Sequence, residues 1–90
     1  MNEPRETRLK RLRMRAMRRG IKEMDLILPA FTATDLDDLD AAELDLFEAL
    51  LAENDHDLYQ WVSGAGVAPP EYAGLIGRIA ARATGVVRPV

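Results

Sequence analysis

Apolar residues in this chain recur three and four positions apart, and no stretch alternates regularly between apolar and polar residues. The clearest case is the set Leu44, Phe47, Leu50 and Leu51. Such spacing places side chains on one face of an α-helix, which has about 3.6 residues per turn, whereas a half-buried strand requires a period of two. The pattern therefore predicts an all-α fold.

Interruptions of this pattern divide the chain into five expected helices. Glycine or proline occurs at positions 20, 29, 64, 69 and 70, and the segments between these breaks have ordinary helix lengths. Short connections favour antiparallel neighbours, so we expect a compact five-helix bundle. We expect one domain at 1–90, with a structured core at about 5–85, a stop at Gly85 and a loose tail at 86–90. The predicted helices cover about 5–17, 20–28, 41–53, 56–63 and 69–84.

Local signals predict several of the boundaries. Pro29 lacks an N–H and disfavours a helical conformation in the residue before it, so we expect the second helix to end or kink there. The segment 32–35 is typical of a loop. Asp40 and Glu43 have the spacing of a capping box at the start of the third helix. Gly64 is expected just past the end of the fourth helix.

The bulk composition limits the kind of protein. None of the 90 residues is a cysteine, which excludes disulfides and thiolate metal sites and favours a reducing compartment. The longest uninterrupted apolar run, at 26–31, has six residues, whereas a membrane-spanning helix needs about 20. Arginines occupy the N-terminal positions where a signal peptide would be apolar. We therefore expect a bacterial cytoplasmic protein without membrane insertion.

Charge is distributed unevenly along the chain. Residues 1–22 carry nine Lys/Arg and two Glu, whereas residues 23–60 carry twelve Asp/Glu and no Lys or Arg. The basic residues include a stripe with helical spacing: Arg8, Arg11, Arg15, Arg18 and Lys22. Such a stripe can bind nucleic acid. The net charge of −3 and the lack of a recognition-helix motif favour instead pairing with the acidic segment or docking on an acidic protein surface.

The sequence offers little for catalysis. His56, the single histidine, lies between Asp55 and Asp57 at an expected helix start, where polar residues occur by default. Ser63, the only serine, lies at a helix end with nothing to activate it. The acidic residues at 35–40 lack the glycine and the bidentate glutamate of an EF-hand loop. We therefore expect neither catalytic nor metal-binding residues, and no enzyme.

The segment 19–23, RGIKE, is the unusual feature. A glycine within a helical pattern weakens the helix by about 1 kcal/mol relative to alanine. Gly20 is therefore either a turn between two helices or a point where another surface approaches the backbone. In the first interpretation Arg19 and Glu23 pair with each other or with solvent. In the second interpretation, Arg19 binds a carboxylate or backbone oxygens of a partner protein, and Glu23 accepts hydrogen bonds from donors on that partner.

Residues 19–23, followed by MDL at 24–26, resemble the RGxxE signature of the SdhE family of succinate dehydrogenase assembly factors. The segment 43–51 is similar to the third helix of that family, and 54–61 is similar to its D-x-D-L-[FY]-x-W segment. The resemblance covers roughly residues 8–82. RGxxE alone is a weak pattern, but its combination with the D-L-Y-x-W block at this spacing in a chain of 90 residues is fairly specific.

The resemblance implies a small five-helix helper protein that is not an enzyme. Members of the family promote covalent attachment of FAD to the flavoprotein subunit of succinate dehydrogenase, and in many bacteria of fumarate reductase too. The resemblance also implies that the flavin is held by this partner, with no cofactor bound tightly here, and that the protein is a monomer when free. The alternative is a small antitoxin-like or regulatory protein that uses the basic stripe on nucleic acid or on another protein.

The resemblance also implies a partner-binding site around RGxxE. Family members often carry a tryptophan shortly before the Arg-Gly pair, where this chain has Met17. Tyr59 and Trp61 are expected in the core, because they lie on the apolar side of a short helix. The predicted contact residues are Arg19, Gly20 and Glu23, extended by Arg15 and Arg18 and supported by Asp25.

Overall fold

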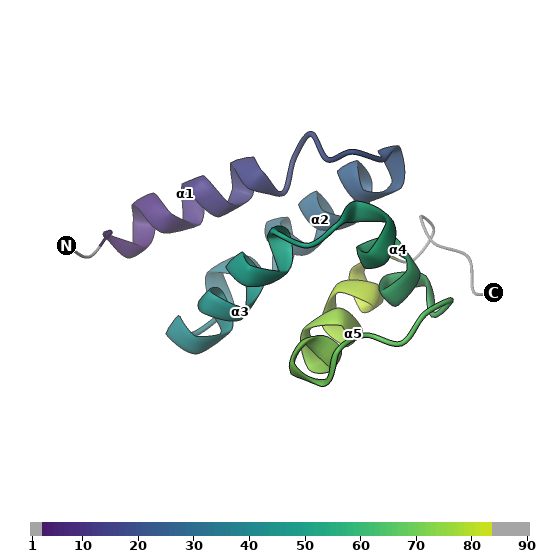
Figure 1. Cartoon of the computed structure of the whole chain (residues 1–90). Coiled ribbons are helices and arrows are strands. Elements are labelled where there is room, and N and C mark those ends of the chain that lie inside the picture. The colour runs from purple at the N-terminus through teal and green to yellow at the C-terminus, as the bar shows by residue number, and fades with distance from the viewer. Residues whose placement is uncertain (1–2, 84–90) are drawn as a thin grey trace.

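The computed structural model describes residues 3–83, and within this range the chain forms five α-helices, two short 3-10 helices and no strand (Figure 1). The predicted all-α, five-helix fold is confirmed. In chain order the elements are α1 (Arg5–Arg15), α2 (Lys22–Thr34), η1 (Leu36–Asp38), α3 (Ala41–Leu51), α4 (Asp55–Ser63), η2 (Pro70–Tyr72) and α5 (Ala73–Arg82).

Helix α2 forms the centre of the core, where it packs against α4 and α5. The rings of Phe31 from α2 and Phe47 from α3 lie with their centroids 5.4 Å apart. Tyr59 and Trp61 of α4 are partly buried and pack against the core, in agreement with their predicted positions. The Trp61 ring lies 6.0 Å from that of Tyr72. The predicted stripe of α3 also faces this core, because all four of its residues are buried.

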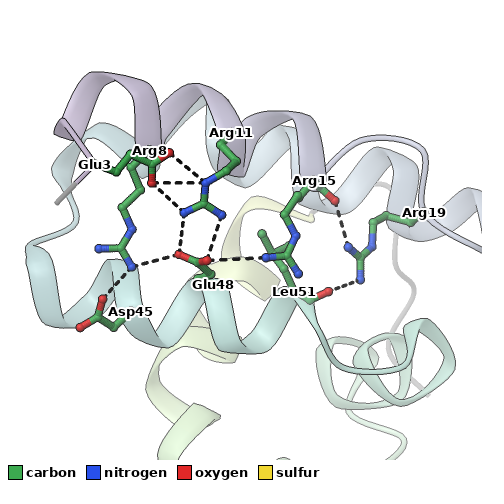
Figure 2. Close-up of polar contacts among 8 residues, drawn as sticks. All are labelled: Glu3, Arg8, Arg11, Arg15, Arg19, Asp45, Glu48 and Leu51. Carbon is green, nitrogen blue, oxygen red and sulfur yellow. Dashed lines mark hydrogen bonds and ion pairs between the residues drawn. The ribbon is translucent and has the colours of Figure 1, made fainter. Parts of the chain in front are cut away.

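Helix α1 crosses one side of the bundle and runs alongside α3 (Figures 1 and 2). Leu12 is the one buried residue within α1, and Ala16 is buried just beyond it. The remaining attachment is largely ionic, because arginines of α1 reach Asp45 and Glu48 on α3. Charge pairing thus fixes the helix that leads into RGxxE.

Pro29 does not end α2, so of the predicted end or kink at this residue the end is wrong. The helix continues through the proline to Thr34, although an interior proline costs about 3 kcal/mol relative to alanine. Leu28 and Phe31, on either side of the proline, are fully buried, and burying each such side chain stabilises the fold by about 1.5–3 kcal/mol. Burial therefore outweighs the lost backbone hydrogen bond. For the same reason the predicted loop at 32–35 is helical through Thr34.

The capping signals are confirmed. The Asp40 carboxylate accepts the backbone N–H of Glu43 at 2.8 Å, and the Glu43 carboxylate accepts that of Asp40 at 3.0 Å. Gly64 follows α4 in the left-handed conformation, with a φ of 86°. Asn54 caps α4 and starts it one residue earlier than predicted.

The other boundaries differ by a few residues. Helices α1 and α3 end two residues before their predicted ends. Helix α5 begins at Ala73 rather than at position 69, because η2 occupies the intervening turn after Pro69. The predicted stop at Gly85 and the predicted tail at 86–90 lie outside the described residues.

Candidate partner-binding site

The RGxxE segment lies in the loop at 16–21, which joins α1 to α2, and in the first turn of α2. Gly20 is in the loop, as the turn interpretation predicts. The left-handed residue of the loop, however, is Arg18, with a φ of 55°. This conformation costs a residue with a Cβ about 1–2 kcal/mol. The chain therefore holds an arginine in a strained position where glycine would fit without strain.

Arg19 points into the molecule and joins three helix ends. Its Nη1 donates to the carbonyl of Arg15 at 2.9 Å, and its Nη2 donates to the carbonyl of Leu51 at 2.8 Å (Figure 2). Its Nε donates to Asp55 Oδ1, also at 2.8 Å. The first two acceptors lie at the ends of α1 and α3, where carbonyls lack helical partners and a cation is favoured. With only 11% of its side chain exposed, Arg19 has little surface for a partner.

Two carboxylates hold the backbone of this loop. Asp55, the first residue of α4, accepts the backbone N–H of Gly20 at 2.6 Å. Asp25, in the first turn of α2, accepts the backbone N–H of Arg19. Both carboxylates lie near helix N-termini, where negative charge is favoured. Asp25 thus holds the loop from within the chain, and its predicted role toward a partner stays a prediction.

The outward-facing charges of the segment are Arg18, Lys22 and Glu23. All three residues are exposed, and among residues 3–83 their side chains form no hydrogen bond or ion pair. Arg15 is intermediate: it is partly exposed and its Nη1 lies 3.8 Å from Glu48 Oε2. Arg19 and Glu23 do not pair with each other, because Arg19 is engaged by Asp55. Of the predicted contact residues, Arg18, Gly20 and Glu23 are exposed to a visiting surface, and Arg15 is partly so.

Large apolar side chains are exposed beside these charges. Met14 and Met17 are 74% and 53% exposed, and with Arg18 they line a shallow depression. Leu26 is 51% exposed and lies one helical turn beyond Glu23, on the same face of α2. Met14 and Leu26 are absent from the predicted site, although both fall outside the apolar stripes of their helices. That displacement is the signal in the sequence that identifies them.

The first part of the basic stripe is used within the fold. Arg8 binds Asp45 at 2.6 Å and Glu48 at 3.1 Å, and Arg11 binds Glu48 with both terminal nitrogens (Figure 2). The hydrogen bonds from Arg11 lower the pKa of the Glu48 carboxyl below its ordinary value. Intramolecular pairing with the acidic segment is thus confirmed. The alternative of nucleic-acid binding loses support, because these guanidinium groups already have carboxylate partners.

The hydroxyl of the only serine has a backbone partner. The Ser63 hydroxyl donates to the backbone carbonyl of Gln60 at 3.3 Å rather than to a side-chain base. Within residues 3–83, no group of three or more His, Cys, Asp or Glu is placed to hold a metal ion. No helix in this range combines the length and apolar character needed to cross a membrane. The site is therefore a surface of charges and apolar side chains.

The fold and the loop define a small helical-bundle protein with a charged and apolar surface at its first interhelical connection. The chain belongs to the family Sdh5, flavinator of succinate dehydrogenase, whose family model matches residues 10–83. The resemblance inferred from RGxxE and the D-L-Y-x-W block is confirmed.

Curated relatives are named as succinate dehydrogenase assembly factors. A protein of Drosophila mojavensis named "Succinate dehydrogenase assembly factor 2-A, mitochondrial" is 41% identical over 73 residues, which cover 79% of this chain and 46% of that protein. A protein of the fungus Mycosarcoma maydis named "Succinate dehydrogenase assembly factor 2, mitochondrial" is 39% identical over 72 residues, covering 80% of this chain and 30% of that protein. The chain thus spans half or less of the length of these relatives.

The prediction of a bacterial cytoplasmic protein is wrong. The relatives are named as mitochondrial proteins of insects and a fungus. The prediction rested on the missing cysteines and on the arginine-rich start. Neither feature distinguishes bacterial cytoplasm from other reducing compartments.

Proposed function

We propose that this chain promotes the covalent attachment of FAD to the flavoprotein subunit of succinate dehydrogenase. The observation that carries the proposal is the match of residues 10–83, nearly the whole described chain, to the flavinator family. The names of the curated relatives, succinate dehydrogenase assembly factor 2, support the same role. The flavoprotein of fumarate reductase is a further proposed client.

The chain acts as a helper rather than as a catalyst. In covalent flavinylation the flavin 8α-methyl group and a histidine of the flavoprotein must be held close together, which is a problem of positioning. A helper that binds the competent conformation of the flavoprotein more tightly than other conformations increases the population of that conformation. In this proposal the flavin stays with the partner, and the helper holds no cofactor tightly and is a monomer when free.

The contact surface is the α1–α2 loop with the first turns of α2. Arg18 and Glu23 supply charges of opposite sign, which fix the orientation of a partner. Met17 and Leu26 supply apolar area, and methionine adapts readily to a facing surface. Gly20 is exposed between these groups and lets a partner approach the backbone closely.

The conformation of Arg18 supports this placement. Its backbone is held in the left-handed region, and non-glycine residues in such conformations concentrate at functional sites. Its side chain is exposed and has no partner among residues 3–83, so no side-chain bond within the described fold calls for an arginine there. Contact between this guanidinium and the flavoprotein would explain why position 18 is an arginine.

A reconstitution with purified components tests the proposed function. The flavoprotein subunit, prepared without flavin, is incubated with FAD in the presence or absence of the chain, and covalent flavin is read as fluorescence of the denatured flavoprotein band. We expect faster attachment with the chain present. Equal rates with and without a stoichiometric amount of the chain would contradict the proposal.

A further inference from the structure

Asp55 makes two hydrogen bonds to adjacent residues of the RGxxE loop. Its Oδ2 accepts the backbone N–H of Gly20 at 2.6 Å, and its Oδ1 accepts Arg19 Nε at 2.8 Å. Asp55 is 35 residues from Gly20 in the sequence and opens a different helix. The bond to Arg19 is charge-assisted, a class roughly twice as strong as neutral hydrogen bonds. One carboxylate therefore fixes both the backbone and the side chain at the start of the motif.

The space at Gly20 is also limited by Asp55. A Cβ at position 20 would lie 3.0 Å from Asp55 Oδ2, closer than ordinary contacts allow. The carboxylate would have to shift by a few tenths of an ångström, which would lengthen its short bonds to Gly20 and Arg19. Among the described glycines, only Gly64 has a positive φ, so conformational freedom does not explain the glycine at position 20. The close approach of Asp55 does explain it.

Arg19 completes the arrangement from the other side. Because it donates to Arg15 and Leu51 as well as to Asp55, it ties the loop to the ends of α1 and α3. With 11% of its side chain exposed, Arg19 acts on the loop rather than on a partner.

From this geometry we infer that Asp55 is a positioning residue of the partner-binding site. It sets the course of the loop that presents Arg18, Gly20 and Glu23, and its close approach favours glycine at position 20. The inference rests on the proposed function for its consequence in binding, whereas the loop geometry can be measured in the free protein.

The free protein is tested by NMR. A backbone amide that donates to a carboxylate at 2.6 Å resonates downfield, so we expect Asp55→Ala to move the Gly20 amide upfield while helicity by circular dichroism is retained. Asp57→Ala is the matched control, because Asp57 is exposed in the same first turn of α4 and its side chain has no partner among residues 3–83. It should leave the Gly20 amide in place. A Gly20 amide that is unmoved by Asp55→Ala would refute the inference.

Binding to the flavoprotein subunit is tested with a double-mutant cycle of Gly20→Ala and Asp55→Ala. We expect each single variant to raise the dissociation constant on the order of tenfold, which is a loss of about 1.4 kcal/mol in binding free energy. Gly20→Ala should cost less in the Asp55→Ala background than alone, because the intramolecular atom that its Cβ meets is gone. Should Asp55→Ala lose helicity, Asp55→Asn serves in its place, with a smaller loss because one oxygen acceptor remains.

The cycle separates the two hypotheses. If Gly20→Ala weakens binding by the same factor in both backgrounds, the glycine is required by the partner and the inference is wrong. If the unmodified chain fails to bind the flavoprotein, the proposed function is wrong, and the positioning by Asp55 is still decided by the Gly20 amide.

Discussion

Arg11 and Glu48 form a two-point contact between α1 and α3, with the guanidinium nitrogens Nη1 and Nη2 at 2.9 and 3.1 Å from the carboxylate oxygens. Arg8 binds the same carboxylate at 3.1 Å, and Arg15 lies 3.8 Å from it. Leu12 is the one buried side chain within α1. Glu48 is therefore the main point at which α1, and the loop that follows it, is fastened to the bundle.

Replacing Glu48 should loosen α1. We expect Glu48→Gln to lower the free energy of unfolding by about 1 kcal/mol, because a network of several charges exceeds the contribution of an isolated surface pair. Urea denaturation measures the change. Asp45→Asn is the control: Asp45 is more exposed and has a single arginine partner, so its effect should be near zero. In 1 M NaCl the two variants should converge, since the Debye length falls to about 3 Å.

Acid should weaken the fold through carboxyls whose pKa is lowered, among them Glu48 and Asp35. Hydrogen bonding from Arg11 lowers the pKa of Glu48 from 4.5, and hydrogen bonding from Thr34, then Arg82, lowers that of Asp35 from 3.8. A group whose pKa is lower in the folded state stabilises the fold above its unfolded-state pKa. That stability is lost as the pH falls through the folded-state value.

We therefore expect the free energy of unfolding to fall with pH below about 4.5, and to continue falling as Asp35 is protonated. Urea denaturation between pH 7 and pH 3 provides the measurement. Glu48→Gln should flatten the upper part of this decline, and Asp35→Asn its lower part. If the free energy of unfolding of both variants falls with pH in parallel with that of the unmodified protein, these carboxyls are not the cause of the acid destabilisation.

Pro29 offers a test of how α2 is held together. Pro29→Ala restores a backbone N–H and a residue with high helix propensity, so we expect a gain of about 1–3 kcal/mol in the free energy of unfolding. The reduced entropy of the unfolded proline chain offsets part of the gain. Thermal and urea denaturation should both show it. A loss of stability would mean that packing around the proline ring outweighs the missing hydrogen bond.

Replacing Arg18 by glycine should stabilise the fold and impair binding to the partner. Arg18→Gly removes the Cβ from a left-handed position and should stabilise the fold by about 1 kcal/mol. The greater freedom of glycine in the unfolded chain reduces this gain. The same variant should slow flavinylation, because it removes an exposed guanidinium from the contact surface. A variant that is more stable and fully active would show that Arg18 takes no part in docking.

The fold was largely predictable because its helices follow apolar spacing and local caps. Asp40 with Glu43, and Gly64, behave as the sequence indicates since their partners lie within a few residues. The end of α2 was predicted wrongly at Pro29. The cost of a proline within a helix is visible in the local sequence, whereas the burial of α2 side chains that outweighs it depends on packing against α4 and α5.

The site likewise has parts that the local sequence predicts and parts that depend on contacts between distant segments. RGxxE could be located from its residue types, but the inward course of Arg19 depends on Asp55, which the sequence places 36 residues away. The exposure of Met14 and Leu26, by contrast, can be inferred locally, because both fall outside the apolar stripes of their helices. Contacts between distant segments are what the local pattern does not encode.

The most direct test of the central claim compares Glu23→Ala with Glu71→Ala in the reconstitution with flavoprotein and FAD. Both glutamates are exposed and without side-chain partners among residues 3–83, but Glu71 lies on η2, outside the proposed contact surface. The account predicts an initial rate of covalent flavin formation that falls on the order of tenfold or more for Glu23→Ala, as for loss of a charged contact worth about 1.5–3 kcal/mol, and is unchanged for Glu71→Ala. Equal rates for the two variants, with both as helical as the unmodified protein, would contradict it.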